Sequence, residues 1–196
     1  MTDKTYIIQF AALKFTQFGS KQFTMDELAT LLGISKKTIY NSFSTKEDLV
    51  KECILYLIQD YNNTISYLTH TETDPITIVI LMYEEAFERL RLFKPSFIFG
   101  LRKYYSSANK VFDDFREEFV NVKVYNLLKT ALNQGILLKA INLELFCDLY
   151  FRKLEELAFL NDNLFEMYSN KALLNHFIVY SLRGITNSGY TNPYFK

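Results

Sequence analysis

The stretch LGISKKTIYNSF, from Leu32 to Phe43, decides how the rest of the sequence is interpreted. Gly33 permits the left-handed backbone that a sharp turn requires, and Ser35 is a residue type that caps helices. Apolar residues recur at helical spacing on both sides of the turn. A short helix that starts after Thr24, the turn, and a second helix over about 36–43 are therefore predicted to form a helix-turn-helix.

Local signals support both helices of this motif. The sequence TMDE, which begins at Thr24, is a capping box in which Thr24 and Glu27 satisfy each other's backbone N–H groups. The apolar residues expected to fill the small core of the motif are Leu28, Ala29, Ile34, Ile39 and Phe43. The remaining side chains of the second helix are then expected to face solvent, and these are Lys36, Lys37, Thr38, Tyr40 and Asn41.

The charge of the chain is balanced overall but uneven locally. Its 22 Lys and Arg residues equal its 22 Asp and Glu residues, so no global field attracts nucleic acid. Between Gly33 and Lys46, however, there are three lysines and no acid. Expected helix N-termini at Thr24, Ser35 and Ser44 also favour anions. The pattern predicts a surface for phosphates and base edges, although bundles that bind no nucleic acid can carry a similar motif.

Helical spacing continues through the rest of the 196 residues, which contain only six glycines and three prolines. The further helices are expected at about 5–18, 44–67, 75–93, 95–105, 109–133, 142–160 and 169–185. The third of the motif's capping signals, STKE from Ser44 to Glu47, opens the long helix at 44–67. The predicted class is all-α, with a three-helix helix-turn-helix domain at 1–47, a larger helical domain at 48–185 and a flexible tail at 186–196.

Several classes of function are excluded by what the sequence lacks. No apolar run approaches the about 18 residues of a membrane span, and no secretory signal is present. Cys53 and Cys147 are expected to be buried free thiols, so a cytoplasmic protein without membrane association is predicted. His70 and His176 are solitary, which suggests neither a metal site nor a catalytic base. We expect no enzyme and no cofactor.

The run AALKFTQFGSKQFTMDELATLLGISKKTIYNSFSTKEDLV, which ends at Val50, resembles the DNA-binding domain of the TetR family of bacterial transcriptional regulators. The residues that carry the resemblance are Phe18, Gly19, Thr24, Glu27, Leu28, Ala29, Gly33, Ser35, Lys36, Thr38, Ile39, Tyr40, Phe43, Lys46, Glu47 and Leu49. The run covers about a fifth of the chain. Elsewhere the resemblance is limited to length and helical character.

The resemblance implies roles for individual residues in binding double-stranded DNA. Thr24, Tyr40 and Lys46 would contact phosphates. The side chains implied to line the groove, beside the helix-capping Ser35, are Lys36, Lys37, Thr38 and Asn41. Many relatives carry glycine or another small residue in place of Lys37, so no relative's target sequence is transferred. A tyrosine that only packs is the alternative for Tyr40.

The resemblance further implies that the larger domain binds a ligand and forms a homodimer. Two of its expected helices are apolar on more than one side, so they must pack on more than one side. The residues expected at the dimer interface are Phe146, Tyr150, Leu157, Leu174, Phe177 and Ile178. Paired copies would hold two reading helices about 34–36 Å apart on a palindromic operator. Burial of these residues within their own subunit is the alternative.

A small-molecule effector of unknown identity is also expected. An apolar cavity is predicted from Phe97, Leu101, Tyr105, Phe115 and Phe119, although aromatic residues at helical spacing can equally form core. The sequence thus predicts a dimeric repressor that a small apolar or amphipathic ligand releases from DNA. A DNA-binding protein without a ligand, acting through protein partners, is the main alternative. A helical enzyme or carrier is a third, with no supporting motif.

Overall fold

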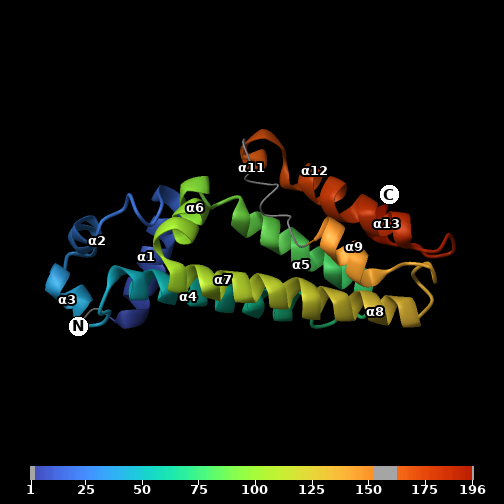
Figure 1. The fold of residues 1–196 in the computed structure, drawn as a ribbon, viewed down its shortest axis with the longest axis horizontal. Helices are drawn as coiled ribbons and strands as arrows, with labels where there is room; N and C mark the ends of the chain where they lie inside the picture. Colours follow the sequence, from blue (N-terminus) through green and yellow to red (C-terminus); the bar gives the residue numbers. More distant parts are fainter. Residues whose placement is uncertain (1–2, 152–162, 196) are drawn as a thin grey trace. The chain divides into compact units, whose positions relative to one another are not determined.

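The computed structural model describes residues 3–151 and 163–195, which form helices joined by turns (Figure 1). Within this described part, extended pairing is limited to one isolated bridge between Leu137 and Thr186. The predicted all-α class is therefore confirmed.

The chain divides into two compact units. The first contains the residues up to Asn62 together with Leu92–Phe115, and the second contains Asn63–Arg91 together with the residues from Arg116 onward. This division differs from the predicted boundary between residues 47 and 48, because a later segment of the chain returns to the first unit. The residues of two helices, Lys46–Leu68 and Ser106–Glu118, are consequently divided between the two units.

The first unit is built around the predicted helix-turn-helix. Its helices are α1 (Lys4–Phe18), α2 (Met25–Leu32), α3 (Lys36–Tyr40), most of α4 (Lys46–Leu68), α6 (Pro95–Tyr104) and most of α7 (Ser106–Glu118). Helix α6 belongs here because it packs on α1. The Lys94 N–H donates to the Thr16 carbonyl at 2.9 Å, and the Tyr105 hydroxyl donates to the Ser20 carbonyl at 3.2 Å.

The second unit is centred on α5. Its elements are α5 (Pro75–Leu90), η1 (Phe119–Val124), α8 (Tyr125–Asn133), α9 (Leu143–Tyr150), α11 (Leu164–Met167), α12 (Asn170–Leu174), η2 (Asn175–Val179), α13 (Tyr180–Ile185) and η3 (Pro193–Phe195). Helix α5 contacts both α8 and α12 (Figure 1). Tyr83 of α5 lies at the middle of an aromatic cluster, 5.2 Å from the ring of Phe119 and 5.0 Å from that of Phe151.

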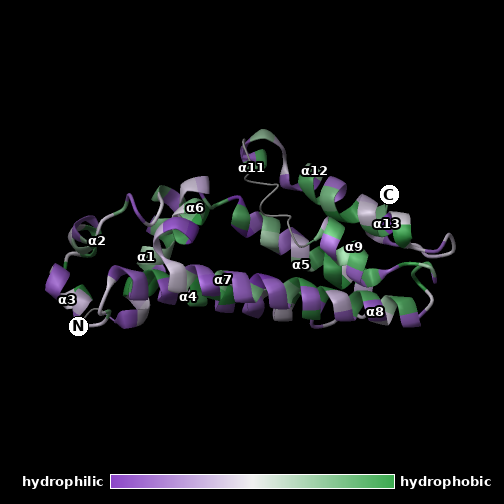
Figure 2. Cartoon of the chain, in the orientation of Figure 1, coloured by the Kyte–Doolittle hydropathy of each residue, from purple (hydrophilic) through white to green (hydrophobic). Residues whose placement is uncertain are grey.

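Hydrophobic and hydrophilic residues alternate along the helices in Figure 2, as packing on one face requires. Among the described helices, none combines the length and the hydropathy needed to span a bilayer. Two predicted helices each contain a π-helical segment, η1 in the helix expected at 109–133 and η2 in that expected at 169–185. Of the helix expected at 142–160, the described part is α9, and the rest lies outside the described residues.

Within the segment expected to be a flexible tail, the described residues 186–195 make specific contacts. The Asn187 N–H donates to the Ile136 carbonyl at 2.8 Å, and Asn192 is buried. The Tyr190 hydroxyl donates to the Asp74 carboxylate at the start of α5. Polar residues of the tail, which are typical of turns, therefore form hydrogen bonds with groups at or near the ends of helices.

Candidate nucleic-acid interface

The helix-turn-helix forms through the local signals read from the sequence. The Thr24 hydroxyl accepts the Glu27 N–H at 3.2 Å, and the Glu27 carboxylate accepts the Thr24 N–H at 2.6 Å, so the predicted capping box is present. Gly33 adopts the left-handed conformation, with φ 65° and ψ 28°. Ser35 caps α3 by accepting the Thr38 N–H at 3.0 Å. These contacts set the angle at which α3 leaves the turn.

The core beneath α2 and α3 leaves one face of α3 open. Leu28, Ala29, Ile39 and Phe43 are buried as predicted, while Ile34 is half-buried. Helix α3 ends at Tyr40, earlier than the predicted limit of 43. Its residues on the other side remain accessible to a large ligand such as a duplex.

The predicted DNA-contacting residues are gathered around this open face, but their exposure differs. Thr38 and Lys46 are half-buried. The exposed members of the set are Thr24, Ser35, Lys36, Lys37, Tyr40 and Asn41. The Tyr40 side chain is accessible enough, at 40% exposure, to bring its hydroxyl to a phosphate.

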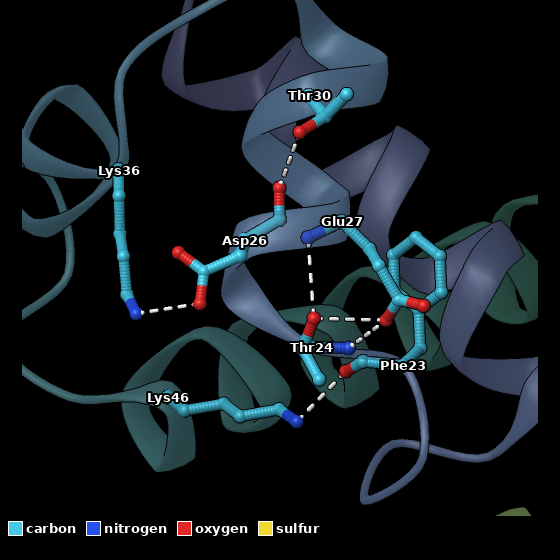
Figure 3. Close-up of polar contacts among 7 residues, drawn as sticks. All are labelled: Phe23, Thr24, Asp26, Glu27, Thr30, Lys36 and Lys46. Carbon is cyan, nitrogen blue, oxygen red and sulfur yellow. Dashed lines mark hydrogen bonds and ion pairs between the residues drawn. The ribbon is translucent and has the colours of Figure 1, made fainter.

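The donor capacity of Thr24 is already used. Its hydroxyl lies 2.8 Å from the Glu27 carboxylate, to which it donates (Figure 3). The hydrogen bonds from the Thr24 N–H and hydroxyl hold the pKa of the Glu27 carboxyl below its usual value. A phosphate contact by Thr24 therefore requires its hydroxyl to leave Glu27.

Lys36 forms an ion pair with Asp26, which lies outside the segment from Gly33 to Lys46 that predicted a positive surface. Its ammonium lies 2.9 Å from Oδ2 of Asp26, in the first turn of α2 (Figure 3). The hydrogen bond to Asp26 raises the pKa of Lys36. The count of charges between Gly33 and Lys46 missed Asp26 because it precedes the turn.

Lys46 is directed into its own domain. Its ammonium donates to the Phe23 carbonyl at 2.8 Å (Figure 3) and lies 5.7 Å from the centre of the Phe15 ring. Burial, which removes water from the ammonium, lowers its pKa. The resemblance implies that Lys46 contacts a phosphate, but its ammonium is already bonded within the domain. A contact with DNA would break the hydrogen bond to the Phe23 carbonyl.

The start of α4 differs from the predicted capping box by one residue. Thr45 and Asp48 form the reciprocal bonds, at 2.8 and 3.0 Å, in place of Ser44 and Glu47. The Glu47 carboxylate instead accepts the N–H and the hydroxyl of Ser107, both at 2.8 Å, in the first turn of α7. These bonds, the backbone one foremost, lower the pKa of Glu47.

The five residues predicted to line a ligand cavity are divided between the two units. Phe97 and Leu101 are fully buried on α6 in the first unit, where the Tyr105 hydroxyl bonds Ser20. Phe115 packs edge-to-face on Tyr61 in the same unit. Phe119 lies in the second unit beside Tyr83.

A cavity of about 500 Å³ is present elsewhere in the second unit. Residues of α5, α12, η2 and the tail line it: Glu84, Phe87, Glu88, Asn170, Lys171, Leu174, Asn175, Pro193 and Tyr194. Its volume lies in the range of small-molecule sites, but its lining is more polar than predicted. None of the predicted five residues belongs to it.

The residues predicted for the dimer interface fall into different environments. Phe146, Leu174 and Ile178 are buried within the chain, and Phe177 is half-buried against Phe87. Such burial matches the alternative that these side chains fill their own subunit. Leu157 lies outside the described residues.

Exposed apolar side chains lie on a different face of α9. Leu145, Leu149 and Tyr150 expose 54%, 66% and 48% of their surface. Tyr150 is thus the one predicted interface residue, among those described, that is exposed. The described residues contain no group of three or more His, Cys, Asp or Glu side chains arranged to hold a metal.

Comparisons with known proteins agree with this geometry. Residues 7–53 match the model of a family described as bacterial regulatory proteins, tetR family. An HTH-type transcriptional regulator of Bacillus subtilis (strain 168), the uncharacterised YhgD, is 42% identical over 57 residues. This match spans 29% of the chain and 30% of that relative.

Solved structures of low sequence identity share the fold over nearly the whole chain. FadR from Bacillus subtilis, in complex with stearoyl-CoA, is 16% identical with a TM-score of 0.72, covering 93% of this chain and 100% of that chain. The fatty acid degradation regulator FadR from Bacillus halodurans is 18% identical with a TM-score of 0.72, covering 94% and 97%. A protein from Saccharomonospora viridis in complex with choline is 15% identical with a TM-score of 0.76, covering 92% and 96%.

The motif, its open face and these matches define a helix-turn-helix protein with a helical second part. The resemblance predicted from the sequence is confirmed for the amino-terminal domain, because residues 7–53 match the tetR family model.

Proposed function

We propose that this protein is a dimeric DNA-binding transcriptional repressor, released from a palindromic operator by a small apolar or amphipathic ligand. The observation that carries the proposal is the open face of α3. Lys37, Tyr40 and Asn41 are exposed there above the buried Ile39. In this motif, the N-terminal residues of the second helix reach base edges in the major groove.

The open face offers each kind of contact that a duplex needs. The ammonium of Lys37 can bind a guanine edge or a phosphate, and the Asn41 amide can bind an adenine edge. The Tyr40 and Ser35 hydroxyls suit phosphate oxygens. Lys46, bonded to Phe23, contributes by holding the domain together.

A homodimer is proposed because one α3 alone covers a single half-site. The exposed apolar residues Leu145, Leu149 and Tyr150 of α9 support such pairing, since an apolar face of this kind favours burial against another surface. A dimer would place two α3 helices about 34–36 Å apart, on successive turns of DNA. Leu149→Glu should then yield monomers in sedimentation velocity, whereas a dimer that persists would exclude this face.

The effector is proposed to act through the second unit. The cavity of about 500 Å³ is large enough for a small molecule, and the fold is shared with structures in complex with stearoyl-CoA and with choline. Helix α4, whose residues are divided between both units, is the proposed connection. A coupling of about 1–3 kcal/mol would change operator occupancy about 5–150-fold.

The proposal is tested by selecting bound sequences from random DNA with the full-length protein. A palindrome with half-sites about one helical turn apart is expected, followed by release of the complex on titration with stearoyl-CoA or choline. Selection of no preferred sequence would contradict the proposal. A cytoplasmic location is part of the same proposal, because the operator must be accessible.

A regulator without a small-molecule ligand is the second candidate. It is favoured by one observation, the complete burial of Phe97 and Leu101 in the first unit, where a cavity was expected. A selected operator whose complex responds to neither tested compound, nor to a metabolite library, would favour this candidate and partner proteins as the controlling factor.

A further inference from the structure

Lys36, Lys37 and Lys46 were expected to give the helix-turn-helix its positive surface. In the structure, each of the three has a different environment. Lys36 is paired with Asp26, at 2.9 Å. Lys46 is half-buried and bonded to the Phe23 carbonyl. The Lys37 side chain is exposed, and its ammonium forms no hydrogen bond or ion pair with the described residues, although its backbone carbonyl accepts the Asn41 N–H. One lysine of the three is therefore fully available to a phosphate.

Asp26 is held in place beside Lys36 by the architecture of α2. The capping box between Thr24 and Glu27 fixes the first turn, and an acid in that turn is favoured by the helix dipole. The Asp26 carbonyl also accepts the Thr30 hydroxyl at 2.9 Å (Figure 3). Lys36, by contrast, lies in the first turn of α3, where a cation is disfavoured by the dipole and gains from a nearby carboxylate.

Both partners of this pair remain exposed, so the pair lies on the surface of the helix-turn-helix and not in its core. The side chains expose 46% for Lys36 and 72% for Asp26. A carboxylate in such a position repels phosphates, and its contact with Lys36 also competes with any phosphate for the ammonium. The two charges together cancel, so Lys37 is the one of the three lysines whose ammonium is exposed without a carboxylate partner among the described residues.

We propose that Asp26 is a specificity-determining residue that limits sequence-independent DNA binding by holding Lys36 and by its own negative charge. The inference rests on the proposed function and adds a role for an acidic residue within it. Sequence-independent affinity comes from phosphate contacts, whereas base edges provide discrimination. A carboxylate that withholds one phosphate contact per subunit therefore lowers affinity for random DNA while the base-contacting residues stay unchanged.

The test compares Asp26→Asn with Asp114→Asn in the full-length protein. Asp114 is a matched control because it forms a similar exposed pair on α7, with Lys110 at 2.7 Å, and its substitution changes the net charge equally. Binding of a fluorescent random-sequence duplex is measured by anisotropy over a series of salt concentrations. Circular dichroism establishes that each variant is folded, and Asp26→Ser replaces Asp26→Asn if the latter is not.

One additional phosphate contact per subunit makes the slope of log K against log salt steeper by about 0.9. The corresponding gain in affinity for random DNA is up to about eightfold per subunit at 0.1 M salt. We expect this for Asp26→Asn and not for Asp114→Asn. The ratio of operator affinity to random affinity should fall in the same variant.

The double variant Asp26→Asn with Lys36→Ala identifies the cation responsible. Its salt slope should return to the wild-type value, because the ammonium released from Asp26 is no longer present. A double variant that keeps the steeper slope would overturn the part of the inference that concerns Lys36.

Two other outcomes would overturn the inference as a whole. Equal behaviour of the two Asp→Asn variants would show that only net charge matters. Weaker operator binding by Asp26→Asn would show that the carboxylate itself contacts DNA, for example a cytosine amine. Both results leave the proposed function standing, whereas a wild-type protein that binds no duplex would refute the function together with the inference.

Discussion

The hydroxyl group of Tyr190 lies 2.8 Å from both carboxylate oxygens of Asp74, which is 116 positions earlier in the chain. Asp74 caps α5 and accepts the Thr77 N–H at 2.7 Å. The Asn192 amide donates to the Thr77 hydroxyl at 2.9 Å. The C-terminal segment is thereby attached to the first turn of α5, the central helix of the second unit.

Removing the hydroxyl of Tyr190 should destabilise the protein. In Tyr190→Phe, the ring can still contact Phe195, but the Asp74 carboxylate loses a donor. We expect the free energy of unfolding to fall by about 1.5–3 kcal/mol, as for hydrogen bonds to charged groups. Urea denaturation at pH 7 measures it. The control is Tyr180→Phe, at an exposed position, and equal stability of the two variants would contradict the role of the contact.

The same contact predicts a dependence on alkaline pH. Burial, together with the Asp74 charge, raises the pKa of Tyr190 above its ordinary value of about 10. A pKa that is higher in the folded state gives a contribution to stability that is complete below the ordinary pKa and is lost as pH rises past it. Wild-type stability should therefore fall more steeply between pH 9 and 11 than that of Tyr190→Phe. Parallel curves in urea denaturation would contradict this.

Two glycines should respond differently to substitution by alanine. Gly33 has φ 65° and open space where a Cβ would lie, so Gly33→Ala should cost only the left-handed backbone, about 1–2 kcal/mol. Gly33→Asn should cost less, because asparagine tolerates this conformation. Gly19 has φ 87°, and its Cβ would lie 2.9 Å from the Ser96 hydroxyl, so Gly19→Ala should cost more. Thermal unfolding that ranks these variants otherwise would contradict the turn geometry.

Lys46 is expected to matter more for stability than for DNA binding. Lys46→Met keeps the apolar stem but leaves the Phe23 carbonyl without its donor, which should lower the free energy of unfolding by about 1 kcal/mol. Lys51→Met, at an exposed position of α4, is the control for loss of a lysine. A salt slope for DNA binding that falls by about 0.9 in Lys46→Met alone would instead support the phosphate contact implied by the family resemblance.

Adjacent lysines should differ in their effect on DNA binding. Lys37→Ala removes the exposed, unpaired ammonium, and we expect the salt slope to fall by about 0.9 per subunit. Lys36→Ala removes a cation that is already neutralised by Asp26, so its slope should change little. Anisotropy titrations of both variants over a series of salt concentrations measure the two slopes. Equal losses of slope would contradict the conclusion that Lys37, and not Lys36, is available to a phosphate.

The parts of the site that sequence reasoning predicted correctly depend on neighbours within a few positions. The capping box at Thr24, the turn at Gly33 and the cap at Ser35 are all present. The box at the start of α4 was displaced by one residue, because Ser44 and Thr45 are both hydroxyl residues followed three positions later by an acid. Residue types alone therefore limit the candidates for a helix cap to a few positions but do not always identify the residue that caps.

The surroundings of the predicted cavity residues and of the tail depend on which helices meet, which the local sequence does not contain. The helical spacing of aromatic residues does not indicate which unit each one belongs to. Phe97 is buried on α6 in the first unit, whereas Phe119 is buried in the second. The cavity described in the second unit is lined by α5, α12, η2 and the tail, segments separated by many positions in the chain. Its polar lining follows from that assembly.

By itself, the sequence determined the helical class, the helix-turn-helix and the family resemblance, since these follow from periodicity, caps and residues in a short continuous run. Tertiary structure alone decided which lysine is available to DNA. Asp26 lies 10 positions before Lys36, and Phe23 lies 23 positions before Lys46, yet both are brought within hydrogen-bonding distance. The physical reason is that hydrogen bonds and close ion pairs depend on separation in space, which helix packing sets and which charge counts along the chain do not contain.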